Sequence, residues 1–430
     1  MADAASRLRS LAEQLLGAPL PVRLRAWDGS EAGPPDAPAL VVRNRRALRR
    51  MLFKPGELGL ARAWVSGDLD IEGDLYTALD AIAGLVWERG EDSRTLRQAV
   101  RDPAVRAAAR DLLKLAGPPI PPAPPREEIR RPRRGLHTRR TDKRAISHHY
   151  DVGNDFYELV LGPSMVYSCA YWEEAGTLET AQRDKLELVC AKLGLSEGQR
   201  LLDVGCGWGS MAIHAAREHG VSVVGVTLSQ EQAAYARKRV ADAGLTDRVE
   251  IRVQDYRDVV DGPYDAISSI GMAEHVGAER YLEYARQLHA LLKPGGRLLN
   301  HQIARRPQRD ETTYEVDEFI DSYVFPDGEL APVGTTVTQL ERAGFEVRDV
   351  ESIREHYART LREWVANLEA GWDHAATLTG PGRARVWRLY MAASALAFEH
   401  NRIGVNQVLA VRTPESGASG LPLRPRTWHG

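Results

Sequence analysis

Short apolar runs alternate with longer amphipathic stretches through the second half of the chain. The apolar runs are rich in valine, leucine and isoleucine and are too short for helices, which favours strands that are buried on both faces. They cover residues 200–204, 221–226, 249–253, 264–270, 296–303 and 405–412. Amphipathic helical spacing appears between and after them, in residues 209–220, 230–244, 280–292, 357–372 and 384–402. This order predicts an α/β fold, built on a doubly wound, Rossmann-like parallel sheet with additional terminal helices.

The first part of the chain has a different pattern. Extended runs at residues 22–27 and 40–43 are mixed with helical stretches at residues 44–53 and 74–90. This mixture predicts a small α+β accessory domain over residues 1–116. An apolar stripe follows the first helix and is formed by Leu8, Leu11, Leu15 and Leu16. Such a stripe either packs on its own domain or lies on a membrane surface.

A proline-rich and then basic stretch separates the two patterns. Six prolines lie within residues 116–125, and nine Arg or Lys against three acidic residues lie within residues 126–144. We therefore expect a linker over residues 117–147, a second domain over residues 148–412 and a flexible tail over residues 413–430. The basic run is either a solvated linker or a contact for phosphate or lipid headgroups. Because it has no interleaved aromatic residue to stack bases, we expect no nucleic acid partner.

Composition narrows the class of protein. The chain has 430 residues, of which 43% are hydrophobic and 27% charged, and its net charge is −2. These values are typical of a soluble globular protein without overall attraction to nucleic acid or anionic lipid. The cysteines Cys169, Cys190 and Cys206 are too scattered for a disulfide framework and form no CxxC pair for zinc, so we expect a cytoplasmic protein and no metal. The N-terminus has no signal pattern, and no run approaches the ~18 apolar residues that span a bilayer.

A glycine-rich loop follows the first predicted strand of the second domain. The sequence LLDVGCGWGS places Gly205, Gly207 and Gly209 directly before a helix, where small residues let a ligand approach the helix N-terminus. A dinucleotide-binding fold would carry an acidic residue at the end of the next strand, but that position is Gly225, and no GK[ST] motif is present. Asp203, before the loop, suits an amine-bearing ligand such as S-adenosylmethionine. The alternative is a structural carboxylate at the sheet edge.

Many separate motifs resemble one family. Their order is that of cyclopropane-fatty-acyl-phospholipid synthases and mycolic acid cyclopropane synthases: SHHYDVGNDFYELVLGPSMVYSCAYW, LLDVGCGWGS, GVTLSQEQ, VQDYRDV, GMAEHVG, NHQI, YVFPDGEL and REHYARTL, within about residues 140–410. Residues 53–75, FKPGELGLARAWVSGDLDIEGDL, resemble the accessory domain of the phospholipid enzymes. The resemblance implies a class I S-adenosylmethionine-dependent methyltransferase that acts on unsaturated phospholipid. It also implies a homodimer, peripherally associated with the inner face of the cell membrane.

The resemblance implies which residues hold the cofactor. The adenosyl and methionyl parts of the cofactor are expected to contact Tyr167, Ser168, Gly205, Gly207, Thr227 and Gln232. Asp203 and Gly209 belong to the same predicted binding site. The turn that contains Thr227 and Gln232 then replaces the missing acidic residue. Tyr256 is expected to stack on the adenine and Asp255 to accept from its amino group. The alternative for Tyr256 is a buried tyrosine that is hydrogen-bonded to backbone.

The implied reaction transfers a methyl group to a cis double bond, and proton loss then closes a cyclopropane. In the family, bound bicarbonate serves as the base. Here it would be held by main-chain groups of Cys169 and Ile303 and by the side chains of Glu274, His301 and Tyr357. Each side chain also has a structural alternative. Glu274 would be a carboxylate before a helix, His301 a hydrogen-bonded histidine at a strand end, and Tyr357 a tyrosine at a helix start. Because a strong nucleophile would capture the carbocation intermediate, Cys169 is not expected to act as a thiolate.

Other residues bear on the acceptor and the product. Aromatic rings stabilise a desolvated cation by about 2 kcal/mol or more, and the candidates are Tyr167, Tyr171, Trp172, Tyr323 and Phe325. Ala273 stands where relatives commonly have an aromatic residue, which alters the acyl slot. The alternatives are a methyl- or methylene-branching fatty acyl methyltransferase, a small-molecule C-methyltransferase and a noncatalytic lipid- or nucleic-acid-binding protein. His148, His149 and His275 have no metal-ligand spacing and are expected to be structural.

Overall fold

The computed structural model describes residues 3–87, 103–129, 152–174, 176–311, 316–326 and 328–424. Two compact units divide these residues between them. The first takes its described residues from the ranges Met1–Arg131, Asp317–Val324 and Gly380–Leu396, and the second from Pro132–Val316, Phe325–Thr379 and Ala397–Gly430. The domain limits given above stay predictions. Most of the basic run, together with His148 and His149, lies outside the described residues.

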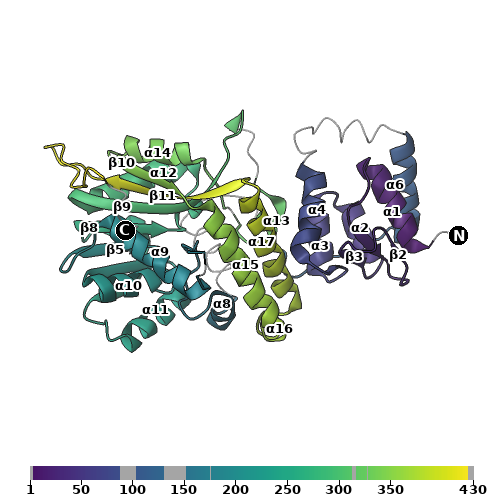
Figure 1. The fold of residues 1–430 in the computed structure, drawn as a ribbon, viewed down its shortest axis with the longest axis horizontal. Helices are drawn as coiled ribbons and strands as arrows, with labels where there is room; N and C mark the ends of the chain where they lie inside the picture. Colours follow the sequence, from purple (N-terminus) through teal and green to yellow (C-terminus); the bar gives the residue numbers. More distant parts are fainter. Residues whose placement is uncertain are drawn as a thin grey trace. The chain divides into compact units, whose positions relative to one another are not determined.

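Within the described residues, the second unit is built on one sheet of seven strands (Figure 1). In spatial order they are β10 (Glu346–Ser352), β11 (Ile403–Val411), β9 (Leu292–Arg305), β8 (Tyr264–Ile270), β5 (Arg200–Val204), β6 (Ser222–Thr227) and β7 (Val249–Val253). The strands from β9 to β7 are parallel, which confirms the Rossmann-like α/β sheet. The sheet is not purely parallel, because β11 runs antiparallel to both β9 and β10. The segment of β10, EVRDVES, has too few apolar residues to predict a strand.

Two layers of helices cover this sheet. Adjacent strand residues point to opposite faces, so Leu201 and Leu202 of β5 belong to different cores. The Leu201 core includes residues of α9 (Leu178–Leu193), α10 (Ser210–His219) and α11 (Gln230–Asp242); the Leu202 core includes residues of α12 (Tyr281–Leu291) and α14 (Val333–Arg342). Figure 1 shows these groups on opposite sides of the sheet. Other helices of the unit are α8 (Asn154–Leu161), α15 (Arg354–Ala370), α16 (Trp372–Thr379), η1 (Tyr256–Asp258), η2 (Ala273–His275) and η3 (Ala278–Arg280).

The first unit has the α+β character that the pattern predicts. Its sheet has the order β2 (Glu31–Ala32), β1 (Arg23–Arg25), β3 (Ala39–Val42) and β4 (Leu69–Glu72). Its helices include α1 (Ala4–Leu16), α2 (Arg46–Phe53), α3 (Glu57–Val65), α4 (Leu75–Trp87), α6 (Pro103–Ala116), α13 (Glu318–Tyr323) and most of α17 (Pro381–Glu399). Arg385 ties α17 to this unit, because its guanidinium donates to the carbonyl oxygens of Trp64 and Leu69, each at 2.6 Å.

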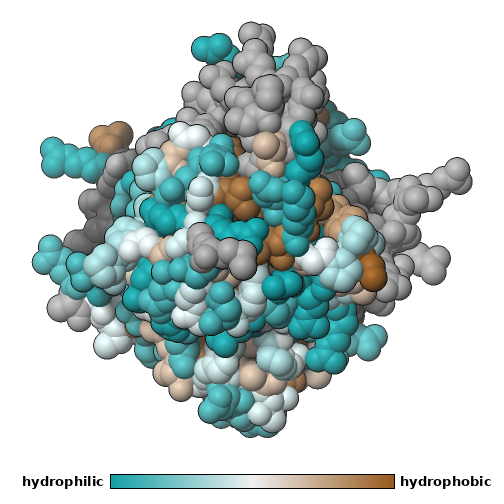
Figure 2. All heavy atoms as spheres, turned by 90° about the vertical axis from the view of Figure 1, so that its right-hand side faces the viewer, coloured by the Kyte–Doolittle hydropathy of each residue, from teal (hydrophilic) through white to brown (hydrophobic). Residues whose placement is uncertain are grey.

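The apolar stripe of α1 packs within the first unit. Leu8 and Leu11 are buried in its core, and Leu15 and Leu16 pack against that core while partly exposed. The structure therefore favours packing over a free membrane-binding face. Figure 2 shows apolar side chains gathered in one area of the face that it views, surrounded by polar ones. None of the described helices has both the length and the apolar character that crossing a bilayer requires.

Candidate active site

The glycine loop lies where the strand order of the sheet reverses. β5 pairs with β6 on one side and with β8 on the other, and such a switch point is where open α/β sheets bind ligands. Gly205, Gly207 and Gly209 have φ angles of 76°, 51° and 82°, which favour glycine. The main-chain N–H groups of Gly205 and Cys206 both donate to the carbonyl oxygen of Val226, at 2.9 and 3.0 Å. These bonds hold the loop against the end of β6.

The structure also shows why Gly225, two positions before Thr227 at the end of β6, carries no side chain. A Cβ atom at Gly225 would lie 2.9 Å from the Cδ1 of Ile251 and 3.0 Å from the side chain of Cys206. A side chain at this position would therefore force its neighbours apart. The packing agrees with the exclusion of a dinucleotide site of the usual kind.

Asp203 is a buried carboxylate with one unused oxygen. The hydroxyl of Ser268 donates to its Oδ1 at 2.7 Å, whereas Oδ2 has no hydrogen-bond partner among the described residues. Burial raises the pKa of Asp203 to about 6, although Ser268 and Lys185 oppose the shift. A buried unpaired oxygen is costly, and a donor from a ligand would satisfy it. The residue therefore fits the amine that the sequence analysis assigns to it.

Lys185 is a second buried ionisable side chain, close enough to Asp203 to interact with it, and it was not predicted from the sequence. Its Nζ donates to the hydroxyl of Ser168 at 3.0 Å. Burial lowers the pKa of Lys185 to about 8, with Cys169 and Asp203 opposing the shift. A signal for it was present in the sequence, because polar residues of this segment recur at the spacing of a buried helix face. Along that face α9 buries Gln182, Lys185, Val189 and Lys192.

The segment before α9 provides aromatic and thiol groups. The Tyr167 ring lies 5.6 Å from the Tyr157 ring and 5.4 Å from the Trp364 ring, centroid to centroid. Cys169 is fully buried, and burial raises the pKa of its thiol well above the usual value. Its Sγ donates to the carbonyl oxygen of Ala170 at 3.2 Å. A neutral thiol favours the main-chain role over a thiolate nucleophile.

The turn after β6 is closed by its own side chains. The hydroxyl of Thr227 donates to Oε1 of Gln232 at 3.0 Å and accepts from the N–H of Ser229 at 3.2 Å. Ser229 caps α11 by accepting from the N–H of Gln232 at 3.2 Å. Thr227 and Gln232 are both buried. These bonds fix the turn beside the glycine loop, whereas its contact with the adenosyl group stays a prediction.

Asp255 and Tyr256 have contacts that the sequence did not indicate. The guanidinium of Arg257 donates to both oxygens of Asp255, at 2.8 and 2.6 Å. Tyr256 is buried, and its ring meets the Tyr284 ring edge to face with centroids 5.4 Å apart. An adenine amino group would therefore share Asp255 with Arg257. The adenine contacts of both residues stay predictions.

Glu274 lies beside the end of β9. Its Oε1 accepts the main-chain N–H of Ile303 at 2.7 Å, so that N–H is already engaged. Its Oε2 is buried and has no partner within the part of the chain that the structure describes. Burial raises the pKa of Glu274 to about 7, against the bond from Ile303. The carboxyl group thus offers one fixed oxygen and one free oxygen.

His301 is oriented by a relay from a buried lysine. Nζ of Lys192 donates to Oε1 of Gln407 at 2.8 Å, so the amide nitrogen of Gln407 faces Nδ1 of His301, at 3.4 Å. Nδ1 is then the acceptor, and the proton lies on Nε2. Nε2 has no partner among the described residues, and burial lowers the pKa of His301 well below its usual value. The neutral ring therefore presents one unused N–H donor.

Tyr357 lies in the first turn of α15 and is buried. Its ring is 4.7 Å from the Phe398 ring and 6.0 Å from the Trp364 ring, centroid to centroid. Because Trp364 also contacts Tyr167, one indole links the predicted base-binding and cofactor-binding tyrosines.

The predicted cation-stabilising aromatics are not equivalent. Tyr171 stacks on His356 at 4.7 Å, and the guanidinium of Arg359 lies 4.2 Å from the centre of the Trp172 ring. A guanidinium on that ring face leaves no room for a second cation there. Tyr323 belongs to the first unit, where its hydroxyl donates to Glu128 at 3.0 Å. Tyr167 and Phe325 stay candidates for this role.

Comparison with known proteins identifies the family. Residues 137–408 match the family model described as mycolic acid cyclopropane synthetase. A probable fatty acid methyltransferase of Mycobacterium tuberculosis is 46% identical over 412 residues, which cover 94% of both chains. The cyclopropane-fatty-acyl-phospholipid synthase of Escherichia coli is 40% identical over 269 residues, covering 63% of this chain and 68% of that protein.

A solved structure gives the same result. The mycolic acid cyclopropane synthase CmaA1, complexed with SAH and CTAB, matches with a TM-score of 0.59 and 34% identity. The match covers 63% of this chain and 98% of that structure. The chain therefore belongs to the mycolic acid cyclopropane synthase family and is an S-adenosylmethionine-dependent methyltransferase.

Proposed function

We propose that this enzyme methylates a cis double bond in an unsaturated fatty acyl chain of a phospholipid and closes the product to a cyclopropane. The observation that carries the proposal is the set of unpartnered buried atoms, among the described residues, near the ends of β5 and β8: Oδ2 of Asp203, Oε2 of Glu274 and Nε2 of His301. Unsatisfied groups of this kind mark a place where ligands complete the hydrogen bonding. The acceptor lies in the inner face of the membrane, where the enzyme acts as a peripheral homodimer.

S-adenosylmethionine, when bound, supplies an electrophilic methyl group on a sulfonium. The chain's task is to fix the donor and the alkene in a dry site, because an alkene is a neutral and weak nucleophile. Asp203 presents Oδ2 to the ammonium of the donor, and Lys185 holds Ser168 beside Tyr167. The glycine loop has no Cβ atom at three positions and would let the methionyl part approach the N-terminus of α10.

Glu274 and His301 are suited to hold bicarbonate, which supplies a weak base. Oε2 of Glu274 accepts from a hydroxyl group, while the N–H at Nε2 of His301 donates to an anionic oxygen. Burial keeps that imidazole neutral, and Lys192 and Gln407 orient it. Because the N–H of Ile303 is engaged by Glu274, we assign Ile303 a positioning role toward Glu274. Tyr357 and Cys169 complete the site from α15 and from the segment before α9.

A methyl- or methylene-branching fatty acyl methyltransferase is the second candidate function. The observation that favours it is that the relative covering 94% of both chains is named a fatty acid methyltransferase, whereas the cyclopropane synthase of E. coli covers 63% of this chain. The same carbocation yields either product, and the proton that is lost decides between them. Ala273, next to Glu274, changes the space in which that choice is made.

The test combines the purified full-length enzyme with S-adenosylmethionine and vesicles of a phospholipid that carries one cis double bond per chain. We expect the acyl chains to gain one CH2 and to show upfield ring protons in NMR spectra. Exomethylene or methyl-branch signals would favour the second candidate, and labelling of soluble acceptors alone would indicate a small-molecule methyltransferase. Vesicles of saturated phospholipid are the control. Removing dissolved bicarbonate should slow turnover, and adding it back should restore the rate.

A further inference from the structure

A second cluster of ligating side chains lies outside the candidate active site, between α9 and α10. Cys190, His214 and His219 each offer one ligand atom, and these atoms all lie within 4.8 Å of one another. Oε2 of Glu187 is hydrogen-bonded to Nε2 of His214 at 3.1 Å and to Nε2 of His219 at 3.0 Å. Glu187 and Cys190 share one face of α9, because they are separated by three positions. Four potential ligands therefore converge from two helices.

The chemistry of this set is that of a borderline or soft cation. Sulfur and imidazole nitrogen suit zinc, whereas magnesium and calcium prefer oxygen ligands. At metal–ligand bonds of about 2.0 to 2.3 Å, the atoms around a tetrahedral zinc ion lie roughly 3.3 to 3.8 Å apart. The atoms of Cys190, His214 and His219 are at most 4.8 Å apart, and Oε2 of Glu187 lies 3.1 and 3.0 Å from the two rings, which is close to this range. Cys190 is buried while the Glu187 side chain is half exposed, which gives a cation an entry from the Glu187 side.

We propose that Cys190, His214 and His219 bind one zinc ion, with the Glu187 carboxylate as the fourth ligand. Binding displaces the proton of the Cys190 thiol and replaces the hydrogen bonds between Glu187 and the two rings. Four protein ligands leave no open position, so the ion has a structural role. The site shares no residue with the candidate active site.

The consequence of binding follows from what else α9 carries. On either side of Cys190, the same helix bears Lys185, which contacts Ser168, and Lys192, which contacts Gln407 behind His301. An ion at Cys190 fixes α9 to α10 and thereby fixes both lysines. The metal is therefore expected to stabilise the folded enzyme and to tighten the geometry of the cofactor side.

The sequence analysis predicted no metal because these ligands have no short, regular spacing. Cys190 belongs to one helix, and His214 and His219 lie beyond β5 and the glycine loop. Only the packing of α10 beside α9 brings the three side chains together. The pair His214 and His219, with Glu187 and Cys190 upstream, is too weak a pattern to separate from chance.

The experiment titrates the metal-free full-length protein with Co2+ and then with Zn2+. We expect one Co2+ per chain, a thiolate-to-cobalt charge-transfer band in the near ultraviolet, and loss of that band when Zn2+ is added. Cys190→Ser should abolish the band, and His214→Gln or His219→Gln should weaken Co2+ binding by tenfold or more. His374→Ala, which changes an exposed histidine of α16, is the matched control and should bind as the native enzyme does.

Thermal unfolding provides a second readout. Zn2+ should raise the unfolding temperature of the native enzyme and of His374→Ala, because a ligand that binds only the folded state stabilises it. It should not raise that of His214→Gln. If Cys190→Ser fails to fold by circular dichroism, the two histidine variants carry the test. Absence of the charge-transfer band in the folded native enzyme, or unchanged Co2+ affinity in both histidine variants, would overturn the proposal.

Discussion

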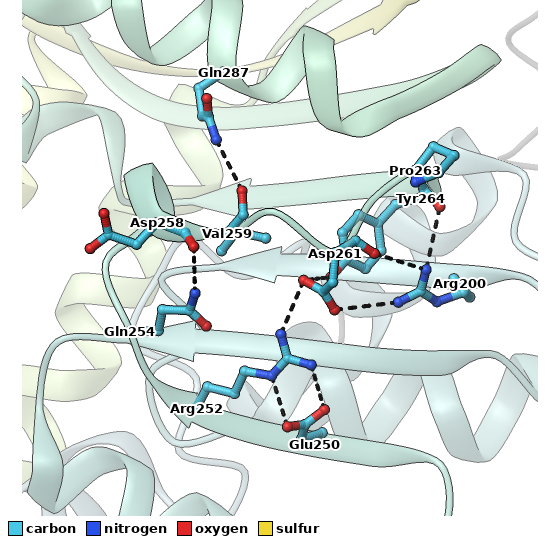
Figure 3. Close-up of polar contacts among 10 residues, drawn as sticks. All are labelled: Arg200, Glu250, Arg252, Gln254, Asp258, Val259, Asp261, Pro263, Tyr264 and Gln287. Carbon is cyan, nitrogen blue, oxygen red and sulfur yellow. Dashed lines mark hydrogen bonds and ion pairs between the residues drawn. The ribbon is translucent and has the colours of Figure 1, made fainter.

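Strand β5 carries a charged residue near each end, and the two ends are built differently. At its start, the guanidinium of Arg200 donates to the carbonyl oxygen of Asp261 at 3.2 Å and lies 4.6 Å from the centre of the Tyr264 ring. Asp261 also accepts from Arg252 at 3.1 Å and from the hydroxyl of Tyr264 at 3.0 Å (Figure 3). The side chains of Arg200, Arg252 and Asp261 are 40%, 25% and 38% exposed. These side chains form a partly hydrated network of paired charges, which reaches from the start of β5 to Arg252 on the outer strand β7, in register with Val226.

At the other end, buried polar atoms lack partners among the described residues. Asp203, Glu274 and His301 each have one such atom. Leaving a buried polar group unsatisfied costs about 1 to 3 kcal/mol. The pKa values of Asp203 and Asp261 are shifted in opposite directions. Burial raises the pKa of Asp203. For Asp261, hydrogen bonds from the Tyr264 hydroxyl and Arg252 outweigh burial and lower the pKa. The difference indicates that the group of unpaired buried atoms is prepared for ligands, while the network of paired charges serves the fold.

The largest expected effect is the loss of turnover in Glu274→Gln. The glutamine oxygen still accepts from the N–H of Ile303, but the amide nitrogen cannot replace the accepting Oε2. Removing a group of the acid–base machinery commonly costs roughly 10²- to 10⁴-fold in rate. Methyl transfer to vesicles and calorimetric binding of S-adenosylmethionine measure the two effects separately. If cofactor affinity collapses together with turnover, the assignment of Glu274 to the base site is wrong.

Although Glu274→Gln should lose turnover, it should gain stability at high pH. The folded-state pKa of Glu274 is raised from 4.5 to about 7, so its favourable contribution is complete below pH 4.5 and is lost as pH rises through 7. Each pKa unit corresponds to about 1.4 kcal/mol. Glu274→Gln should thus be more stable than the native enzyme above pH 7, by on the order of 3 kcal/mol, and equal to it near pH 4.

Urea unfolding of the cofactor-free protein at several pH values measures this difference. Glu250→Gln, in the network of paired charges on β7, is the matched control, because hydrogen bonds from Arg252 lower the pKa of Glu250. Its stability contribution therefore has the opposite sign and is lost as pH falls. Parallel pH profiles for the two variants would contradict the comparison.

Asp203→Asn should weaken the binding of the cofactor. The factor by which affinity falls should be smaller than the factor by which turnover falls in Glu274→Gln. A hydrogen bond to a charged group is worth about 1.5 to 3 kcal/mol, so we expect an affinity for S-adenosylmethionine that is at least roughly tenfold weaker. The asparagine retains an acceptor for Ser268, which keeps the local fold. Arg200→Gln, on the same strand, provides the control and should leave the affinity unchanged. Unchanged affinity in Asp203→Asn would remove this residue from the cofactor site.

The fold could be predicted largely from sequence because its signals are local. Apolar runs such as residues 264–270 mark strands that are buried on both faces, and the glycines after Asp203 mark the loop. The parallel order then follows from the alternation with helices. β10 could not be predicted in this way, because its charged residues alternate only weakly with apolar ones.

The candidate site could be predicted only where a motif carried it. Lys185 and Lys192 are absent from the predicted site, since their roles depend on which face of α9 is buried. Likewise, no local pattern shows that Arg359 covers Trp172 or that Glu274 engages the N–H of Ile303. These contacts join segments that are far apart in sequence, and only the tertiary fold brings them together.

Cys169→Ser should have a small effect on turnover. The thiol is buried and neutral, and the predicted contribution of this residue is made by its main chain, which serine keeps. A misplaced buried hydroxyl costs about 1 to 2 kcal/mol, so turnover should fall by less than about thirtyfold and remain measurable. Resistance of the native enzyme to alkylation by iodoacetamide should accompany this result. Complete loss of activity in a folded variant would point instead to covalent catalysis.

The smallest expected effect lies in the network of paired charges around Arg252. Arg252→Gln removes ion pairs with Glu250 and Asp261, and ion pairs of this exposure contribute about 0.2 to 1 kcal/mol each. Because they are partly hydrated, their contribution should shrink further as salt is added. Turnover and cofactor affinity should not change, since Arg252 contacts no residue of the candidate site in the described structure. Loss of activity at unchanged stability would mean that the paired network and the candidate site are coupled, and the contrast between them would no longer separate ligand binding from folding.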